Sequence, residues 1–312
     1  MAFDRRGAIA GFGATGLLAL TGCKGAHEAV DEADEAFRQA LADLEGRAGG
    51  KLGVCVLDCR DGALAGHRLD ERFTMCSTFK LPLAALVLAR MDAGAIALDA
   101  MLPISPADPV GHAPVVRARL AQGATSMAIL ELGEAAQTQS DNGAANILLR
   151  ALGGPQALTA FFRSLGDEVT RLDRYEPALN TSHDGDLRDT TTARAMARSL
   201  RAILTGAVLT PASRTRLIEW MIATRTGLMR LRGGLPADWR AGDKTGTAAS
   251  DGSYAGKAND VAISWHPRRA EPFIITAFYE TVGHSVDGPQ PEDDAVIAQA
   301  GRIASQWIDG RL

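Results

Sequence analysis

Residues 75–80 read Met-Cys-Ser-Thr-Phe-Lys, and residues 81–89 read Leu-Pro-Leu-Ala-Ala-Leu-Val-Leu-Ala. The second run is apolar on every side, which predicts a buried helix rather than a surface one. Pro82 has no amide hydrogen and fits best in the first turn of a helix, so the helix is expected to start near Ser77 and Thr78. Ser77 and Lys80 are three residues apart and therefore share one helical face.

A serine hydroxyl becomes a good nucleophile only when a base stands beside it, and a lysine desolvated by a buried helix can be that base. Free amides at the helix start can stabilise an oxyanion that forms at the serine. A chain of this length carries roughly one Ser-x-x-Lys by chance. However, of its 33 lysines and arginines only five are lysines. Arginine cannot serve as a base, so Lys80 looks chemically specified.

The overall composition limits which classes of protein this chain can belong to. With 312 residues, 46% of them hydrophobic, the chain can build a large core or two packed domains. A net charge of −4 gives no basic footprint, so nucleic acid is not expected as a partner. The six histidines form no His-x-His or His-x-x-x-His pair, so the ligand spacing of a zinc hydrolase is missing. We expect neither a metal nor another cofactor.

Residues 1–23 have the pattern of an export signal. Arg5 and Arg6 precede the short apolar stretch 7–20, which is too short to remain as a membrane-spanning helix. The stretch ends in Leu-Thr-Gly-Cys at 20–23, which resembles the bacterial lipobox, and this predicts a lipid on Cys23. An ordinary signal peptide cut nearby is the alternative, and the arginine pair leaves Sec and twin-arginine export both open. Either route predicts a periplasmic protein, tethered to the membrane if Cys23 is lipidated.

Three further cysteines are predicted to be unpaired. Cys55 and Cys59 are four residues apart in an expected strand, about 13 Å, which is too far for a disulfide. Cys76 has no obvious partner. Such thiols are most often buried as small apolar side chains.

Strand patterns bracket a helical middle. Helices are predicted over 27–47 and 292–307, with helical patterns dominating from 77 to about 218, and strands over 52–57, 63–68, 239–247, 260–265 and 272–281. We therefore predict an α/β fold. One antiparallel sheet is built from 27–68 and 219–312 and flanked by the terminal helices, and an all-helical domain, 69–218, is inserted between them. The Ser77 helix would start near their junction, where sites commonly form.

Three further motifs carry chemistry. Ser140-Asp141-Asn142 offers a hydroxyl that could relay a proton and an amide that could bind a substrate amide. Lys244-Thr245-Gly246-Thr247 lies in a strand, where a glycine often marks the close approach of another backbone, and a substrate could be that approaching chain. Glu176 precedes a proline in the polar loop 171–180, and a carboxylate near Ser77 could activate water. Each motif alone is a weak signal.

Taken in order, Ser77-x-x-Lys80, Ser140-x-Asn142, Glu176-x-x-x-Asn180 and Lys244-Thr245-Gly246 resemble the class A serine β-lactamases, from about residue 30 to the C-terminus. The resemblance implies the serine β-lactamase and penicillin-binding-protein fold, a monomer, and β-lactams as substrates. Antibiotic resistance would follow.

The resemblance also implies roles for these residues. The lactam carbonyl would acylate Ser77, with Lys80 and the water held by Glu176 as two candidate bases. Glu176 and Asn180 would hold the deacylating water, and Ser140 would protonate the lactam nitrogen. The substrate-binding residues would be Asn142 for the side-chain amide and Lys244, Thr245, Gly246 and Thr247 for the carboxylate end. The amides of Ser77 and Thr247 would form the oxyanion hole, and Arg174 would pair with Asp189 to close the loop.

Two departures from the family pattern matter. Many relatives bind the substrate carboxylate with an arginine on the strand after Lys-Thr-Gly, but residues 248–266 contain none. Arg230, placed as in some class A enzymes, is the predicted substitute. Cys76 matches a cysteine that one carbapenem-hydrolysing group links to a second cysteine, whose position here is Ala248. This weakens a carbapenemase interpretation.

Two other functions share parts of the pattern. A D,D-peptidase or penicillin-binding protein also has Ser-x-x-Lys, Ser-x-Asn and Lys-Thr-Gly, and a lipoprotein sensor could be acylated by an antibiotic without turning it over. Both lack the water activator that Glu176 and Asn180 would provide. These two residues therefore favour the hydrolase.

Overall fold

A five-stranded antiparallel sheet joins the two ends of the chain. The computed structural model describes residues 1, 20–181, 183, 185–250, 254–281, 288 and 290–312, with side chains from residue 32 onward in the first helix. The sheet has the order β2-β1-β9-β8-β7. Its strands are β1 (Lys51–Asp58), β2 (Leu64–His67), β7 (Arg240–Ala248), β8 (Lys257–Trp265) and β9 (Phe273–Glu280). Because β1 lies between β2 and β9, the predicted sheet from both chain ends is confirmed.

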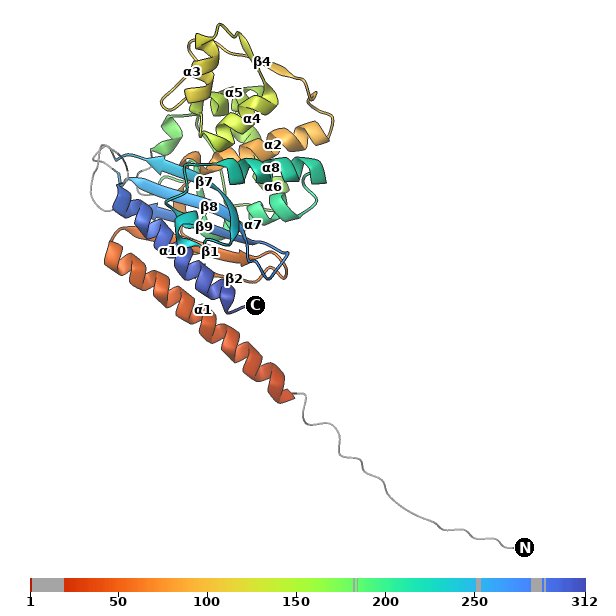
Figure 1. Ribbon diagram of the computed structural model, residues 1–312, viewed down its shortest axis with the longest axis vertical. Helices are drawn as coiled ribbons and strands as arrows, with labels where there is room; N and C mark the ends of the chain where they lie inside the picture. The colour runs from red at the N-terminus through yellow and green to blue at the C-terminus, as the bar shows by residue number, and fades with distance from the viewer. Residues whose placement is uncertain (2–19, 182, 184, 251–253, 282–287, 289) are drawn as a thin grey trace.

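Two terminal helices cover one face of this sheet. Helices α1 (Leu20–Ala48) and α10 (Pro291–Asp309) run side by side across it (Figure 1). The Phe37 and Trp307 rings lie 5.8 Å apart between centroids, and Trp307 Nε1 donates to Asp34 at 2.7 Å. Apolar side chains of both helices pack against those of β1, β8 and β9. This packing holds the sheet from behind, away from the Ser77 helix.

The remaining helices gather around α2 (Lys80–Asp92), whose first nine residues are all buried. An apolar run with no polar face can be stable only inside such a bundle. The other helices are α3 (Pro114–Ala121), α4 (Ile129–Thr138), α5 (Asn142–Leu152), α6 (Pro155–Ser164), α7 (Ala193–Thr205), α8 (Pro211–Ala223) and α9 (Leu231–Gly234). Figure 1 shows α2, α4, α5 and α8 on the side of the sheet opposite α1 and α10. The exact domain ranges 69–218 and 219–312 stay a prediction.

The local structure differs from expectation in three places. A 3₁₀ turn, Cys76–Phe79, carries Ser77, and the α-helix begins only at Lys80. Two small sheets were not expected, β3 (Arg72–Thr74) with β6 (Thr190–Thr192) and β4 (Met101–Pro103) with β5 (Ser126–Ala128). Strands of three residues are too short to show a period. Helix α1 starts at Leu20 and so includes Cys23, while residues 2–19 of the expected export signal lie outside the described residues.

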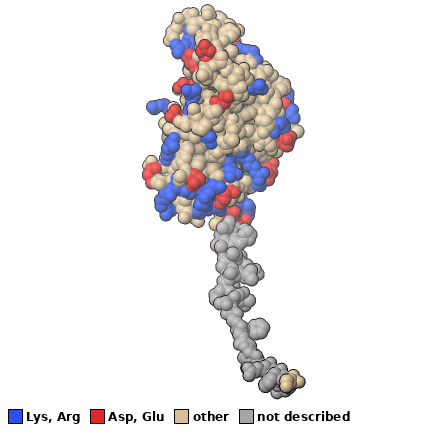
Figure 2. All heavy atoms as spheres, turned by 90° about the vertical axis from the view of Figure 1, so that its right-hand side faces the viewer, with Lys and Arg blue, Asp and Glu red and all other residues tan. Residues whose placement is uncertain are grey.

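Cys55, Cys59 and Cys76 are unpaired, as predicted. Burial raises the pKa of each thiol to about 12, so none is a thiolate near neutral pH. None of the described helices is long and apolar enough to span a membrane. Acidic and basic side chains are interspersed over the face drawn in Figure 2, in line with the small net charge.

Candidate active site

Ser77 lies where the bundle meets the sheet. The residue before it, Cys76, has φ +46°, a left-handed backbone that is rare for a side chain of this kind. Strand β7 passes directly against this turn. A Cβ on Gly246 would lie 2.6 Å from the Met75 carbonyl oxygen, so only glycine fits. The backbone that approaches Gly246 is therefore that of residue 75, which corrects the suggestion that the glycine makes room for a substrate chain.

Lys80 connects the groups predicted from separate motifs. Its Nζ lies 2.9 Å from Ser77 Oγ and 2.8 Å from the Ser140 carbonyl oxygen, and it also donates to Asn142 Oδ1. Glu176 Oε1 lies 3.1 Å from the same nitrogen. The side chain is fully buried, and desolvation lowers the pKa of Lys80 while Glu176 opposes that shift. A lysine with a lowered pKa beside a serine hydroxyl can take up its proton.

Glu176 reaches Ser77 from the loop 171–180. Its Oε1 accepts from Ser77 Oγ at 3.4 Å, and its Oε2 accepts from Asn180 Nδ2 at 2.6 Å. The backbone of Glu176 is held by Asn146, whose amide group both accepts from its N–H and donates to its carbonyl oxygen at 2.9 Å. Sequence reasoning missed Asn146. Its only signal is an amide side chain among the apolar residues of α5.

The loop is closed by the predicted pair Arg174 and Asp189. Arg174 Nε donates to Asp189 Oδ2, and the amides of Asp173 and Arg174 donate to Asp189 Oδ1 at 2.7 and 3.0 Å. Asp189 is fully buried with φ +58°. Because its oxygens hold backbone amides as well as a guanidinium, this one carboxylate fixes the path of the loop that carries Glu176.

The Ser140 hydroxyl stands between the side-chain nitrogens of two lysines. Lys244 Nζ lies 3.1 Å and Lys80 Nζ 3.4 Å from its Oγ. Ser140 has φ +55° and is, like Cys76 and Asp189, in the left-handed region. Burial and the nearby charge of Lys80 lower the pKa of Lys244 to about 7. A hydroxyl in this position can pass a proton between a lysine and a reacting atom.

Arg230 lies behind the Thr247 end of β7 and is only 5% exposed. Its Nη2 donates to Thr247 Oγ1 at 2.9 Å, and its Nη1 donates to the Gly246 carbonyl oxygen at 3.0 Å. Its Nε pairs with Asp294 at 2.7 Å. The guanidinium is therefore fixed to the strand that carries the Lys-Thr-Gly-Thr motif, and it is not a solvated surface charge.

Most of the predicted side chains line a cavity of about 240 Å³, whereas Lys80, Lys244 and Arg230 are not among its lining residues. It is lined by Ser77, His112, Ser140, Asn142, Glu176, Asn180, Thr226, Thr245 and Thr247. Two of these residues, His112 and Thr226, were not predicted. His112 Nε2 contacts the Gln139 carbonyl oxygen at 2.9 Å, and Thr226 Oγ1 lies 2.7 Å from Thr245 Oγ1. Neither belongs to a motif, so only the fold reveals them.

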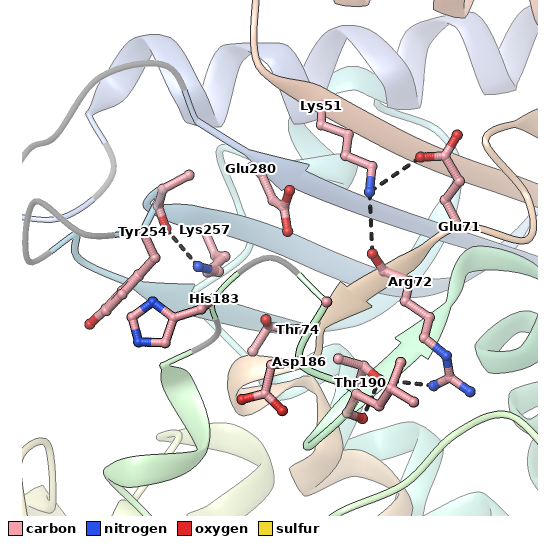
Figure 3. Close-up of a pocket in the computed structure, with 13 residues that line it drawn as sticks. Lys51, Glu71, Arg72, Thr74, His183, Asp186, Thr190, Tyr254, Lys257 and Glu280 are labelled. Atoms are coloured by element: carbon pink, nitrogen blue, oxygen red, sulfur yellow. Dashed lines mark hydrogen bonds and ion pairs between the residues drawn. The ribbon is translucent and has the colours of Figure 1, made fainter.

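A second cavity of about 470 Å³ contains none of the predicted site residues. Figure 3 shows Lys51 pointing toward Glu71 and the Arg72 carbonyl oxygen at its edge, with Nζ distances of 3.2 and 3.5 Å. Among the described residues, no three His, Cys, Asp or Glu side chains gather as metal ligands.

The first cavity combines a serine nucleophile, a buried lysine, a proton-relaying hydroxyl and a carboxylate–amide pair that can hold water. This set defines a serine hydrolase that works through an acyl-enzyme. The profile of the family described as "Beta-lactamase enzyme family" matches residues 36–308. The chain belongs to this family, in its class A branch.

Similar proteins cover nearly the whole chain. Beta-lactamase L2 of Stenotrophomonas maltophilia is 42% identical over 96% of this chain and 95% of its own. The carbapenem-hydrolyzing beta-lactamase KPC of Klebsiella oxytoca is 40% identical over 96% of this chain and 93% of its own. Among solved structures, an ancestral (GNCA) class A beta-lactamase has a TM-score of 0.80 and 51% identity, covering 86% of this chain and 99% of its own.

Proposed function

We propose that this protein hydrolyses the amide bond of β-lactams through an acyl-enzyme on Ser77, deacylated by a water that Glu176 activates, and so gives resistance to these antibiotics. Family membership supports the reaction class. The observation that carries the proposal is the position of Glu176, 3.4 Å from Ser77 Oγ and tied to Asn180. A carboxylate there can polarise a water against the ester carbonyl.

Acylation would begin with attack of Ser77 Oγ on the lactam carbonyl. The serine proton passes to Lys80 or to the water held by Glu176, since both groups touch the hydroxyl or lie within reach of it. The amides of Ser77 and Thr247 would receive the oxyanion. Cleavage of the C–N bond needs a proton on the leaving nitrogen, and Ser140, in contact with Lys80 and Lys244, would deliver it.

The substrate would be held at its two ends. Lys244, Thr245 and Thr247, with Gly246 against the serine turn, would bind the carboxylate, and Arg230 would support that end through Thr247. Asn142 would bind the side-chain amide from the other end. In deacylation, Glu176 takes the proton of the water as its oxygen attacks the ester, and the proton then returns to Ser77 Oγ. The hydrolysed product leaves with no cofactor required.

The alternatives are a D,D-peptidase or penicillin-binding protein and an acylated sensor that does not turn over. A chromogenic cephalosporin distinguishes them. The purified protein is expected to give many turnovers per active site at a steady rate. A burst of one equivalent of chromophore followed by no further release would instead identify one of the two alternatives.

The lowered pKa of Lys244, about 7, predicts a pH effect on substrate binding. Below this pKa the side chain is an ammonium that attracts the substrate carboxylate, and above it the side chain becomes neutral. We therefore expect kcat/KM for carboxylate-bearing β-lactams to fall as the pH rises through about 7 to 9. The measurement is a pH profile of kcat/KM. In Lys244→Arg, whose charge persists, the fall should be absent, and an identical fall in both proteins would contradict the assignment.

We also propose that Cys23 carries a lipid that tethers a periplasmic enzyme to the membrane. The support is the Leu-Thr-Gly-Cys sequence at residues 20–23. Cys23→Ser is expected to move the enzyme from the membrane fraction to the soluble periplasmic fraction. Cell fractionation with mass spectrometry of the mature N-terminus tests this. A parent protein that is already soluble, with its N-terminus at another residue, would rule out the tether.

A further inference from the structure

Two aspartates lie side by side behind the Lys-Thr-Gly-Thr strand. Asp243 on β7 and Asp260 on β8 are both fully buried. Asp260 is paired with Thr245 across the sheet. Asp243 lies two residues before Thr245 on β7, so it is the diagonal neighbour of Asp260 on the same face of the sheet. Their carboxyl groups are within hydrogen-bonding reach of each other. Neither residue lines the cavity at Ser77.

The surroundings do not supply enough donors for two carboxylates. Asp243 Oδ2 faces Gly227 so closely that a Cβ on that glycine would lie 1.6 Å from it. Among the described residues, neither oxygen of Asp243 nor Asp260 Oδ1 accepts a hydrogen bond from an N–H or O–H group, and Arg232 approaches Asp243 Oδ1 only as an ion pair. An ionised carboxylate only accepts, so two of them in contact would leave Asp243 Oδ2 and Asp260 Oδ1 unpaired and would repel each other. A single proton between them removes both costs.

We propose that Asp243 and Asp260 share one proton, and that this carboxylic acid–carboxylate pair is the positioning device for the turn that carries Arg230. The turn is attached to the pair at the two residues that directly follow Arg230. The Leu231 amide donates to Asp260 Oδ2 at 3.0 Å, and Arg232 Nε lies 2.6 Å from Asp243 Oδ1. Directly before these two anchors, Arg230 reaches forward to Thr247 Oγ1 at 2.9 Å.

The charges around the pair agree with one negative charge on it. Arg232 faces Asp243 directly, while Arg230 faces Asp260 and is itself paired with Asp294. Lys244 adds a further positive charge nearby. Desolvation raises the pKa of Asp243 to about 6 and also raises the pKa of Asp260 well above its ordinary value, the latter also because Asp243 is a like charge. A single shared proton would leave one negative charge on the pair, and Arg232 faces that charge.

The shared proton can be observed without any substrate. Infrared spectra of the intact enzyme at pH 7.5, which is about three units above the ordinary pKa of a carboxyl group, should contain the carbonyl band of one protonated carboxylic acid. The band should disappear in Asp243→Asn and in Asp260→Asn. Asp58→Asn is the matched control, because Asp58 is also fully buried but Arg269 holds its pKa below the usual value. Absence of the band in the parent, or its persistence in both asparagine variants, would overturn the shared proton.

The positioning role rests on the proposed function and has its own readout. In Asp243→Asn the side-chain amide can still donate to Asp260, so kcat/KM for a carboxylate-bearing β-lactam should stay within about threefold of the parent value. Asp243→Ala removes that donor and should lower kcat/KM about tenfold, mainly by raising KM. The loss should be non-additive with Arg230→Ala, since both remove the same support from Thr247. Additive losses would overturn the positioning role. If Asp243→Ala does not fold, Asp260→Ala combined with Arg230→Ala provides the same cycle.

A negative result on turnover and a negative result on the infrared band have different meanings. Should the parent show no β-lactam turnover, the proposed function is wrong while the infrared band still decides whether the proton is shared. Should turnover be normal and the band be missing, the proposed function stands and the aspartate pair does not.

Discussion

Glu176→Ala is expected to convert the enzyme into a protein that is acylated but hardly released. The substitution removes the carboxylate that lies 3.4 Å from Ser77 Oγ and accepts from Asn180 at 2.6 Å, so no base remains to activate a water against the acyl-enzyme. General-base catalysis contributes about 10²–10⁴-fold, so the deacylation rate should fall by roughly that factor. Mass spectrometry should then show an adduct on Ser77 that persists for minutes or longer.

The same variant addresses the open question of the acylation base. If Lys80 takes the serine proton, acylation of Glu176→Ala should remain fast, because the 2.9 Å contact between Lys80 Nζ and Ser77 Oγ is untouched. If the water held by Glu176 takes it, acylation should slow together with deacylation. Glu168→Ala is the control, since its side chain is 79% exposed in the segment leading to the same loop. Turnover of Glu176→Ala at the parent rate would remove Glu176 from the mechanism.

The parts of the site that sequence predicted are those set by short-range geometry. Three-residue spacing in a helical turn brings Lys80 to 2.9 Å from Ser77 whatever the rest of the chain does. The long apolar run after Lys80 predicted a buried helix because no surface helix lacks a polar face. Strand patterns at both chain ends predicted one sheet that joins them, and the pairing of β1 with β9 makes that connection. The order of the motifs then indicated which distant segments meet.

What sequence could not predict depends on long-range contacts. Asn146 holds the backbone of Glu176 across thirty residues of chain, and nothing in its neighbourhood on α5 indicates that partner. The neighbour of Gly246 is the Met75 carbonyl oxygen, which became apparent only once β7 was placed against the serine turn. Strands β3 and β6 have three residues each and gain their stability by pairing with each other rather than from a pattern.

Arg232 shows the same limit for a single charge. From sequence alone, Arg232 is the obvious control for Arg230, two residues away, because its substitution is expected to change kcat/KM much less. In the structure its Nε is 2.6 Å from the buried Asp243, and its side chain is only 13% exposed. Its removal would leave a buried carboxylate without its cation, which costs stability by itself. A control for Arg230 must therefore come from elsewhere. Arg240 is exposed on strand β7, which carries the Lys-Thr-Gly-Thr motif, and is suitable.

Arg230→Ala is expected to lower kcat/KM for carboxylate-bearing β-lactams by roughly ten- to a hundredfold. Lys244 offers a point charge, whereas the guanidinium holds Thr247 Oγ1 at 2.9 Å and fixes the direction in which that hydroxyl meets a carboxylate. A charge-assisted hydrogen bond contributes about 1.5–3 kcal/mol, which corresponds to this loss. Most of it should be a rise in KM, since the carboxylate is bound in the substrate complex as well as in the transition state.

The variant also leaves Asp294 and the carbonyl oxygens of Gly246 and Asn259 without their donor, so stability must be measured beside activity. Thermal melts should show a lower Tm for Arg230→Ala, and kinetics are to be taken well below it. Arg230→Lys restores the charge but not the planar fork, so it should recover only part of the lost kcat/KM. Arg240→Ala should leave kcat/KM near the parent value. If Arg230→Ala folds and turns over several such substrates at the parent kcat/KM, Lys244 and the two threonines hold the carboxylate without help from Arg230.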